Sequence, residues 1–149
     1  MGMPRFLCEG RSLEDREMSE ATSTKSLLEA VDDYFDLMYD YDVSRFGRVF
    51  ADSARLHGLS GDALKLISAQ DFESALASNP SPQSKSAPRH QEILLVDFAS
   101  STQATVKVRV RIDTLQYLDY LSYHRVDGAW VITAKSFHIE KTFEPAEQA

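Results

Sequence analysis

Cysteine is almost absent from this sequence, and long apolar runs are missing altogether. The single cysteine, Cys8, cannot form a disulfide within one chain, which is typical of a protein in a reducing compartment. No stretch approaches the ~18 apolar residues that span a bilayer, and the N-terminus lacks the apolar region of a secretion signal. We therefore expect a cytoplasmic protein that does not contact a membrane.

Positive charge is also scarce. The chain has 16 Lys and Arg against 23 Asp and Glu, which gives a net charge of −7, whereas nucleic-acid binding requires clustered basic residues. The one basic cluster, Lys107, Arg109 and Arg111, has the period of two that marks one face of a strand. We expect a solvated strand face or a dimer rim there, and no nucleic-acid partner.

Groups that bind metals are few and poorly spaced. No pair of histidines has the helical spacing of a zinc site, and none is accompanied by cysteine. The sequence also lacks the strand-to-helix turn that carries a catalytic serine. We expect no metal and no cofactor. The four histidines are His57, His90, His124 and His138.

The length of 149 residues suits one domain. Residues 1–22 show no periodicity and are expected to form a disordered extension, followed by a domain at 23–143 and a tail at 144–149. The domain should open with a helix, continue with a short helix after Asp42, and include a third helix that begins near Ser68. The apolar residues at helical spacing in the first helix are Leu27, Leu28, Val31, Phe35 and Met38.

The second half of the chain reads as antiparallel strands that follow a loop rich in proline and serine at 79–88. Residues 104–113 alternate strictly between apolar and polar side chains, which indicates a strand with one buried face. Asp127-Gly128 separates two further strands, and this dipeptide favours the type I′ turn of a hairpin. Helices on one face of such a sheet predict an α+β fold.

Several short motifs have the order and spacing of one known superfamily. They are Tyr34-Phe35, Ala54-Arg55-Leu56-His57-Gly58, Asp119-Tyr120-Leu121-Ser122 and Val126-Asp127-Gly128-Ala129-Trp130-Val131-Ile132, followed by Lys135 and Phe137. In order and spacing they are similar to nuclear-transport-factor-2-like proteins, and most of all to the branch known as “putative lumazine-binding” domains, which is close to the polyketide-cyclase-like branch. The resemblance covers about residues 24–140. It implies a cone-shaped fold in which a curved antiparallel sheet wraps around about three N-terminal helices, with an open-ended pocket and a homodimer formed through the sheet.

The resemblance does not fix the function, because the superfamily includes isomerases, dehydratases, cyclases, hydrolases and proteins without catalysis. The first helical part is also similar to ketosteroid isomerases. That similarity implies an oxyanion donor at Tyr34, but it places the isomerases' basic aspartate at Gly58 and their second donor near Ser122. Steroid isomerase activity is therefore disfavoured.

Three polar residues are the candidate catalytic groups: Tyr34, His57 and Asp119. Tyr34 lies one helical turn from Val31 and shares its inward side, and His57 falls on the strand that forms the pocket rim in similar proteins. Asp119 is a lone acid in an aromatic and aliphatic stretch, where burial can raise a carboxyl pKa. The alternatives are structural: Tyr34 packs in the core, His57 lies near a turn, or Asp119 pairs with Lys135. Strand register decides between the functional and the structural roles of His57 and Asp119, since a shift of one residue turns either side chain outward.

Four further residues are candidate ligand contacts: Tyr41, Tyr120, Lys135 and His138. Lys135 and His138 are an odd number of residues apart, so at most one of them faces a pocket if the strand alternates regularly. We expect a protein that binds a small hydrophobic or aromatic molecule, with cofactor-free acid–base chemistry of the dehydratase, isomerase or cyclase type. The alternative is a structural or protein-interaction module without catalysis.

Overall fold

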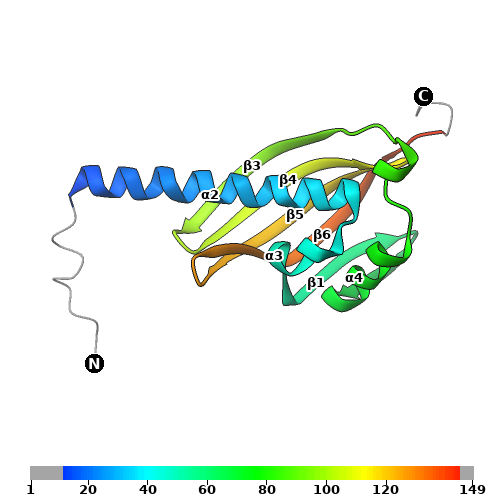
Figure 1. The fold of residues 1–149 in the computed structure, drawn as a ribbon, viewed down its shortest axis with the longest axis horizontal. Helices are drawn as coiled ribbons and strands as arrows, with labels where there is room; N and C mark the ends of the chain where they lie inside the picture. Colours follow the sequence, from blue (N-terminus) through cyan, green and yellow to red (C-terminus); the bar gives the residue numbers. More distant parts are fainter. Residues whose placement is uncertain (1–11, 145–149) are drawn as a thin grey trace.

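The computed structural model describes residues 12–144, in which a long helix lies across one face of a curved sheet (Figure 1). This helix, α2, spans Leu13–Asp40. The short elements η1, α3 and α4 lie near its C-terminal end, and η2 follows α4. Their bounds are η1 Val43–Arg45, α3 Phe46–Val49, α4 Ala69–Ser78 and η2 Gln83–Lys85.

The sheet has six strands in the order β2-β1-β6-β5-β4-β3. All neighbours are antiparallel except β1 and β6, which run parallel and are separated along the chain by α4 and four strands. The helices thus cover one face of an open, mostly antiparallel sheet, which confirms the predicted α+β fold. The strands are β1 Phe50–Ser60, β2 Ala63–Ser68, β3 Gln91–Ser100, β4 Gln103–Ile112, β5 Leu115–Val126 and β6 Ala129–Thr142.

The core lies between α2 and the inner face of the sheet. The alternation predicted at 104–113 is observed over 104–110 of β4, where Val106 and Val108 are fully buried. It breaks at Arg111, which was expected on a solvated strand face but is 6% exposed. Leu27 and Val31 supply the matching apolar stripe on α2. The hairpin between β5 and β6 is confirmed as well, since Asp127 has φ 51° and Gly128 has φ 80°, the positive values that a type I′ turn requires.

The first helix begins at Leu13 and not near Ser23, which corrects the predicted disorder of residues 12–22. Ser12 caps this helix by accepting a hydrogen bond from the backbone N–H of Asp15. The first turns extend past the end of the sheet (Figure 1), and their side chains are exposed. A helix without a packed face has no apolar periodicity, so the sequence pattern could not reveal it. Residues 1–11 and 145–149, the rest of the predicted tails, lie outside the described residues.

Trp130 joins the β5–β6 hairpin to α2. Its indole is 4% exposed, its Nε1 donates a hydrogen bond of 3.0 Å to Ser26 Oγ, and its ring packs edge-on against Phe98. This one side chain therefore fills a core site and also satisfies a polar group on the helix.

Replacing Trp130 with Ala should lower the free energy of unfolding by about 3–5 kcal/mol, as expected for a large buried aromatic side chain. Val126→Ala, in the same hairpin, is the control and should change it by less than about 0.5 kcal/mol, because Val126 is 52% exposed. Urea denaturation of both variants gives the comparison. A loss below ~1 kcal/mol for Trp130→Ala would contradict the anchoring role.

Candidate functional site

A cavity of about 220 Å³ opens between α2, α4 and the inner face of the sheet. Nine of its ten lining residues are apolar or aromatic, and the tenth is Lys135. Such a cavity favours an apolar ligand that is oriented by very few polar groups. The nine are Met38, Tyr41, Leu56, Ile67, Phe72, Leu76, Ile112, Tyr117 and Phe137.

Behind Lys135 lies a buried polar cluster that joins three elements. The hydroxyl of Tyr34, on α2, donates a hydrogen bond of 2.5 Å to Asp119 Oδ2, on β5. The Nζ of Lys135, on β6, lies 3.7 Å from the same oxygen. Tyr34 and Asp119 are fully buried and Lys135 is 6% exposed. The cluster therefore contains a buried charge pair, and one of its members, Lys135, lies at the wall of the cavity.

Strand geometry explains why these side chains meet. Asp119 alternates with Leu121 and Tyr123, which are also buried, so all three point toward α2. On β6, Ile132 pairs with Tyr123 and Ala134 pairs with Ser122, which leaves Thr133 as an extra residue in a β-bulge. A bulge shifts the alternation by one residue.

The bulge is what turns Lys135 inward. Trp130 and Ile132 already face the core, so regular alternation would have placed Lys135 on the outer face. Thr133 is held by its hydroxyl, which lies 2.6 Å from Nδ1 of His124 on β5. His124 and Thr133 thus set the position of Lys135 without touching it.

Burial changes the proton affinities in the cluster. The pKa of Tyr34 is raised well above its ordinary value, first by burial and then by the charge of Asp119 and its hydrogen bond, so the phenol stays a donor. Burial lowers the pKa of Lys135, and the nearby Asp119 charge opposes part of that effect. Lys135 Nζ also lies 5.1 Å from the ring centre of Tyr34 and 5.0 Å from that of Phe72. The amine is thus held by one carboxylate and two aromatic faces.

Asp119 has one oxygen that is not engaged. Its Oδ1 is buried and forms no hydrogen bond among the residues that the structure describes. Buried carboxylate oxygens normally have a partner. Oδ1 is therefore an acceptor in the core that has no partner within residues 12–144, and Asp119 itself is not among the residues that line the cavity.

The predicted site residues separate into two groups. Tyr34, Asp119 and Lys135 come together, and Tyr41 lines the same cavity. His57, Tyr120 and His138 do not reach it. Their neighbours Leu56, Asp119 and Phe137 face inward, so alternation turns these three to the exposed outer face of the sheet.

Several cavity residues were not singled out from the sequence. Phe72 belongs to the narrow apolar face of the predicted third helix, and Phe137 is one of the residues that carry the family resemblance; these were the available signals. The position of the Phe137 ring depends on Gly58, because a Cβ at Gly58 would lie 2.2 Å from that ring. The ring therefore occupies the place where the resemblance to ketosteroid isomerases puts a basic aspartate, and a side chain at Gly58 would displace it.

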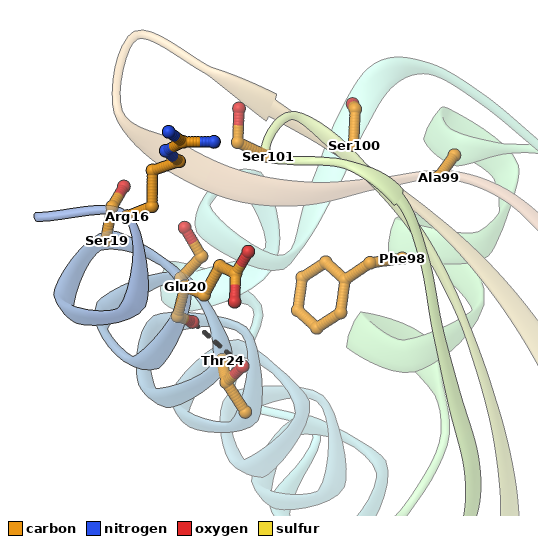
Figure 2. A pocket seen from close by; sticks show the side chains of 9 residues that line it. Arg16, Ser19, Glu20, Thr24, Phe98, Ala99, Ser100 and Ser101 are labelled. Atoms are coloured by element: carbon orange, nitrogen blue, oxygen red, sulfur yellow. Dashed lines mark hydrogen bonds between the residues drawn. The ribbon is translucent and has the colours of Figure 1, made fainter. Parts of the chain in front are cut away.

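A second, larger cavity of about 440 Å³ lies between the first turns of α2 and the turn that joins β3 to β4. Figure 2 shows Phe98 directed toward the helix, with Glu20 and Thr24 facing it and Ser100 and Ser101 on the turn. These polar residues are exposed, and the one buried polar side chain on its wall is Ser23. It lacks a buried charged group, so we place the functional site in the smaller cavity.

Two structural features bear on other classes of site. Within residues 12–144, no group of three His, Cys, Asp or Glu side chains is arranged to hold a metal ion. Within the same residues, no helix is both long and apolar enough to cross a membrane.

Comparison with known families identifies the chain. Residues 22–138 match the family described as “Putative lumazine-binding”, and the chain belongs to that family. No protein of curated function matches the sequence. The family description gives no residue roles, so it leaves the chemistry of the cavity to be argued from its geometry.

Solved structures place the fold among the nuclear-transport-factor-2-like proteins. A protein of unknown function from Silicibacter pomeroyi, described as NTF-2 like, superimposes with a TM-score of 0.73 at 19% identity, covering 81% of this chain and 98% of its own. A protein from Novosphingobium aromaticivorans described as a “Putative Scytalone Dehydratase” gives 0.57 at 12% identity, covering 85% and 95%. A type 2 hexachlorocyclohexane dehydrochlorinase gives 0.59 at 11% identity, covering 83% and 89%. At these identities the likeness shows the fold alone.

Replacing Asp119 with Asn should lower the free energy of unfolding by about 3–5 kcal/mol at neutral pH, because Lys135 then lacks its counter-charge in the core. The loss should shrink as pH rises. Without Asp119 the pKa of Lys135 falls further below that of the unfolded chain, so the unfolded state binds more protons and stability increases with pH.

Urea denaturation at pH 6 and pH 9 tests both the size and the direction of this effect. Asp97→Asn, on the exposed face of β3, is the control and should have little effect at either pH. Asp119→Leu combined with Lys135→Met should be more stable than Asp119→Asn, since no buried charge remains. Equal losses at both pH values would refute the uncompensated-charge account.

Proposed function

We propose that this protein binds a small hydrophobic or aromatic molecule in the cavity between α2, α4 and the sheet. We further propose that it performs cofactor-free acid–base chemistry there, of the dehydratase, isomerase or cyclase type. One observation carries the proposal: the amine of Lys135 reaches an otherwise apolar cavity from a buried cluster with Tyr34 and Asp119. Pairs of ionisable groups held in an apolar site are a frequent feature of acid–base catalysts.

The three residues have different roles in this proposal. Lys135 exchanges a proton with the ligand, and its lowered pKa brings it closer to the pH at which a general base is effective. Asp119 holds the amine in place from behind through Oδ2. Tyr34 keeps Asp119 oriented through its short hydrogen bond.

The cavity also restricts the ligand. Its volume of about 220 Å³ is below the ~300–1,000 Å³ of sites for drug-sized molecules, which favours a compact molecule. Structures with the same fold include proteins described as a dehydratase and a dehydrochlorinase. They support elimination chemistry on this scaffold, but the assignment rests on Lys135, because fold alone does not determine function.

The second candidate is a binding module without catalysis. It is favoured by a lining that is apolar or aromatic at nine of ten positions and by the pairing of Lys135 with Asp119, which can be a purely structural ion pair. The two candidates differ in whether a bound ligand exchanges protons with Lys135.

Proton exchange at the carbon next to a ketone separates the two candidates. We expect the protein to accelerate deuterium incorporation into 1-tetralone, a compact aromatic ketone, by at least about 10²-fold over buffer, the usual contribution of a general base. Lys135→Met should abolish the acceleration, and native mass spectrometry should still show bound ketone. Binding by the wild type without faster exchange would sink the catalytic proposal and leave the binding module.

We also propose that the protein is a homodimer formed through the outer face of the sheet. Strand pairing places one row of side chains straight across this face, and Leu95, Tyr120 and Leu66 in that row are 54%, 43% and 62% exposed. A partly apolar surface of this kind suits a second copy of the chain. The full row is Leu95, Lys107, Tyr120, Ser136, His57 and Leu66.

Light scattering should give about twice the chain mass, and Tyr120→Glu should shift the protein toward the monomer by placing a charge in the apolar part of the row. Lys25→Glu, on the exposed side of α2, is the charge-changing control and should leave the mass unchanged. A monomeric mass for the wild type at high concentration would rule out the dimer. The cytoplasmic location expected from the single cysteine stays a prediction.

A further inference from the structure

The amine of Lys135 lies in an environment that no other lysine shares. It is 6% exposed and borders the apolar cavity, whereas Lys25, Lys65, Lys85 and Lys141 are exposed and Lys107 lies on the outer face. A primary amine attacks carbon only in its neutral form, and burial lowers the pKa of Lys135 toward that form. The site thus combines a reactive amine with space for an apolar molecule.

We propose that Lys135 forms a covalent imine with small apolar aldehydes and ketones that enter the cavity, so that carbonyl compounds are the ligand class of this site. This inference builds on the site of the proposed function and adds a covalent intermediate to it. The geometry that supports it is the approach of Nζ to the cavity, with Asp119 Oδ2 3.7 Å away to take up its proton.

The reaction balances with the groups that are present. Asp119 takes a proton from the ammonium group, and the lone pair of Nζ attacks the carbonyl carbon to form a carbon–nitrogen bond. The nitrogen proton passes to the former carbonyl oxygen, which gives a carbinolamine. Asp119 returns its proton to the departing hydroxyl, which leaves as water, and the product is a protonated imine. One ammonium and one carbonyl give one iminium and one water, without oxidant or reductant.

The cavity stabilises the product for two reasons. Its apolar lining disfavours the water that would hydrolyse the imine. The iminium keeps the positive charge of the ammonium, so it retains Asp119 and the faces of Tyr34 and Phe72, whose ring centres lie about 5 Å from Nζ. An iminium withdraws electrons and so acidifies the adjacent carbon, which would serve dehydration, isomerisation or cyclisation alike.

Reductive trapping tests the imine directly. The full-length protein is incubated with benzaldehyde or 1-tetralone and sodium cyanoborohydride, which converts an imine into a stable secondary amine, and peptides are mapped by mass spectrometry. We expect labelling of Lys135 at least about 10-fold above that of any other lysine. Lys135→Arg, which keeps the charge, should lose this label, and Lys107→Arg is the matched control that should retain it.

Each outcome decides between the hypotheses. Equal labelling of all lysines in the wild type, which requires no variant, would overturn the imine proposal, as would an unchanged label in a folded Lys135→Arg protein. Accelerated deuterium exchange without trapping would leave Lys135 as a simple base and refute the imine alone. Trapping without accelerated exchange would establish the imine and refute the acid–base function.

Discussion

The interaction on which the inner half of this molecule depends is the hydrogen bond from Tyr34 to Asp119, with Lys135 beside the same carboxylate. A charged carboxylate is tolerated in a core only when other groups compensate it. Those groups come from α2 and β6, so the pairing fixes the helix against two neighbouring strands. Moving any of the three elements by one residue would leave a charge without a partner.

The same constraint shapes the cavity. Because Lys135 must reach Asp119, β6 carries a bulge at Thr133, and beyond it Phe137 faces inward beside Gly58. The absence of a side chain at Gly58 makes room for that ring, so the cavity has an aromatic wall at the position where the resemblance to ketosteroid isomerases implies an aspartate. One local irregularity therefore decides which chemical groups this scaffold presents, which is why the fold alone is a poor guide to activity.

Much of this could be read from the sequence, and the failures have physical causes. The alternation in β4 and the Asp127-Gly128 turn are local signals, and both are observed. Tyr34 and Asp119 were candidates because of their apolar surroundings, and the structure brings them together. The start of α2 was missed because the side chains of its first turns are exposed and show no apolar periodicity. His57 was expected at the pocket rim but lies on the outer face of the sheet. Its face depends on how β1 pairs with strands distant in the sequence, and the residues around His57 do not reveal that pairing.

The candidate functional site and the proposed dimer surface lie on opposite faces of the same strands. Asp119 and Tyr120 are adjacent in β5, and Leu56 and His57 are adjacent in β1, with one residue of each pair on either face. A partner on the outer face would restrict these strands directly behind Lys135, whose inward position depends on a single bulge. The bulge is one of the points where the strand pairing is irregular. Contacts with a partner on the outer face would therefore reduce the mobility of the strands at the position that holds Lys135. The proposed dimer would therefore support, from the outer face, the strands that hold the amine in place.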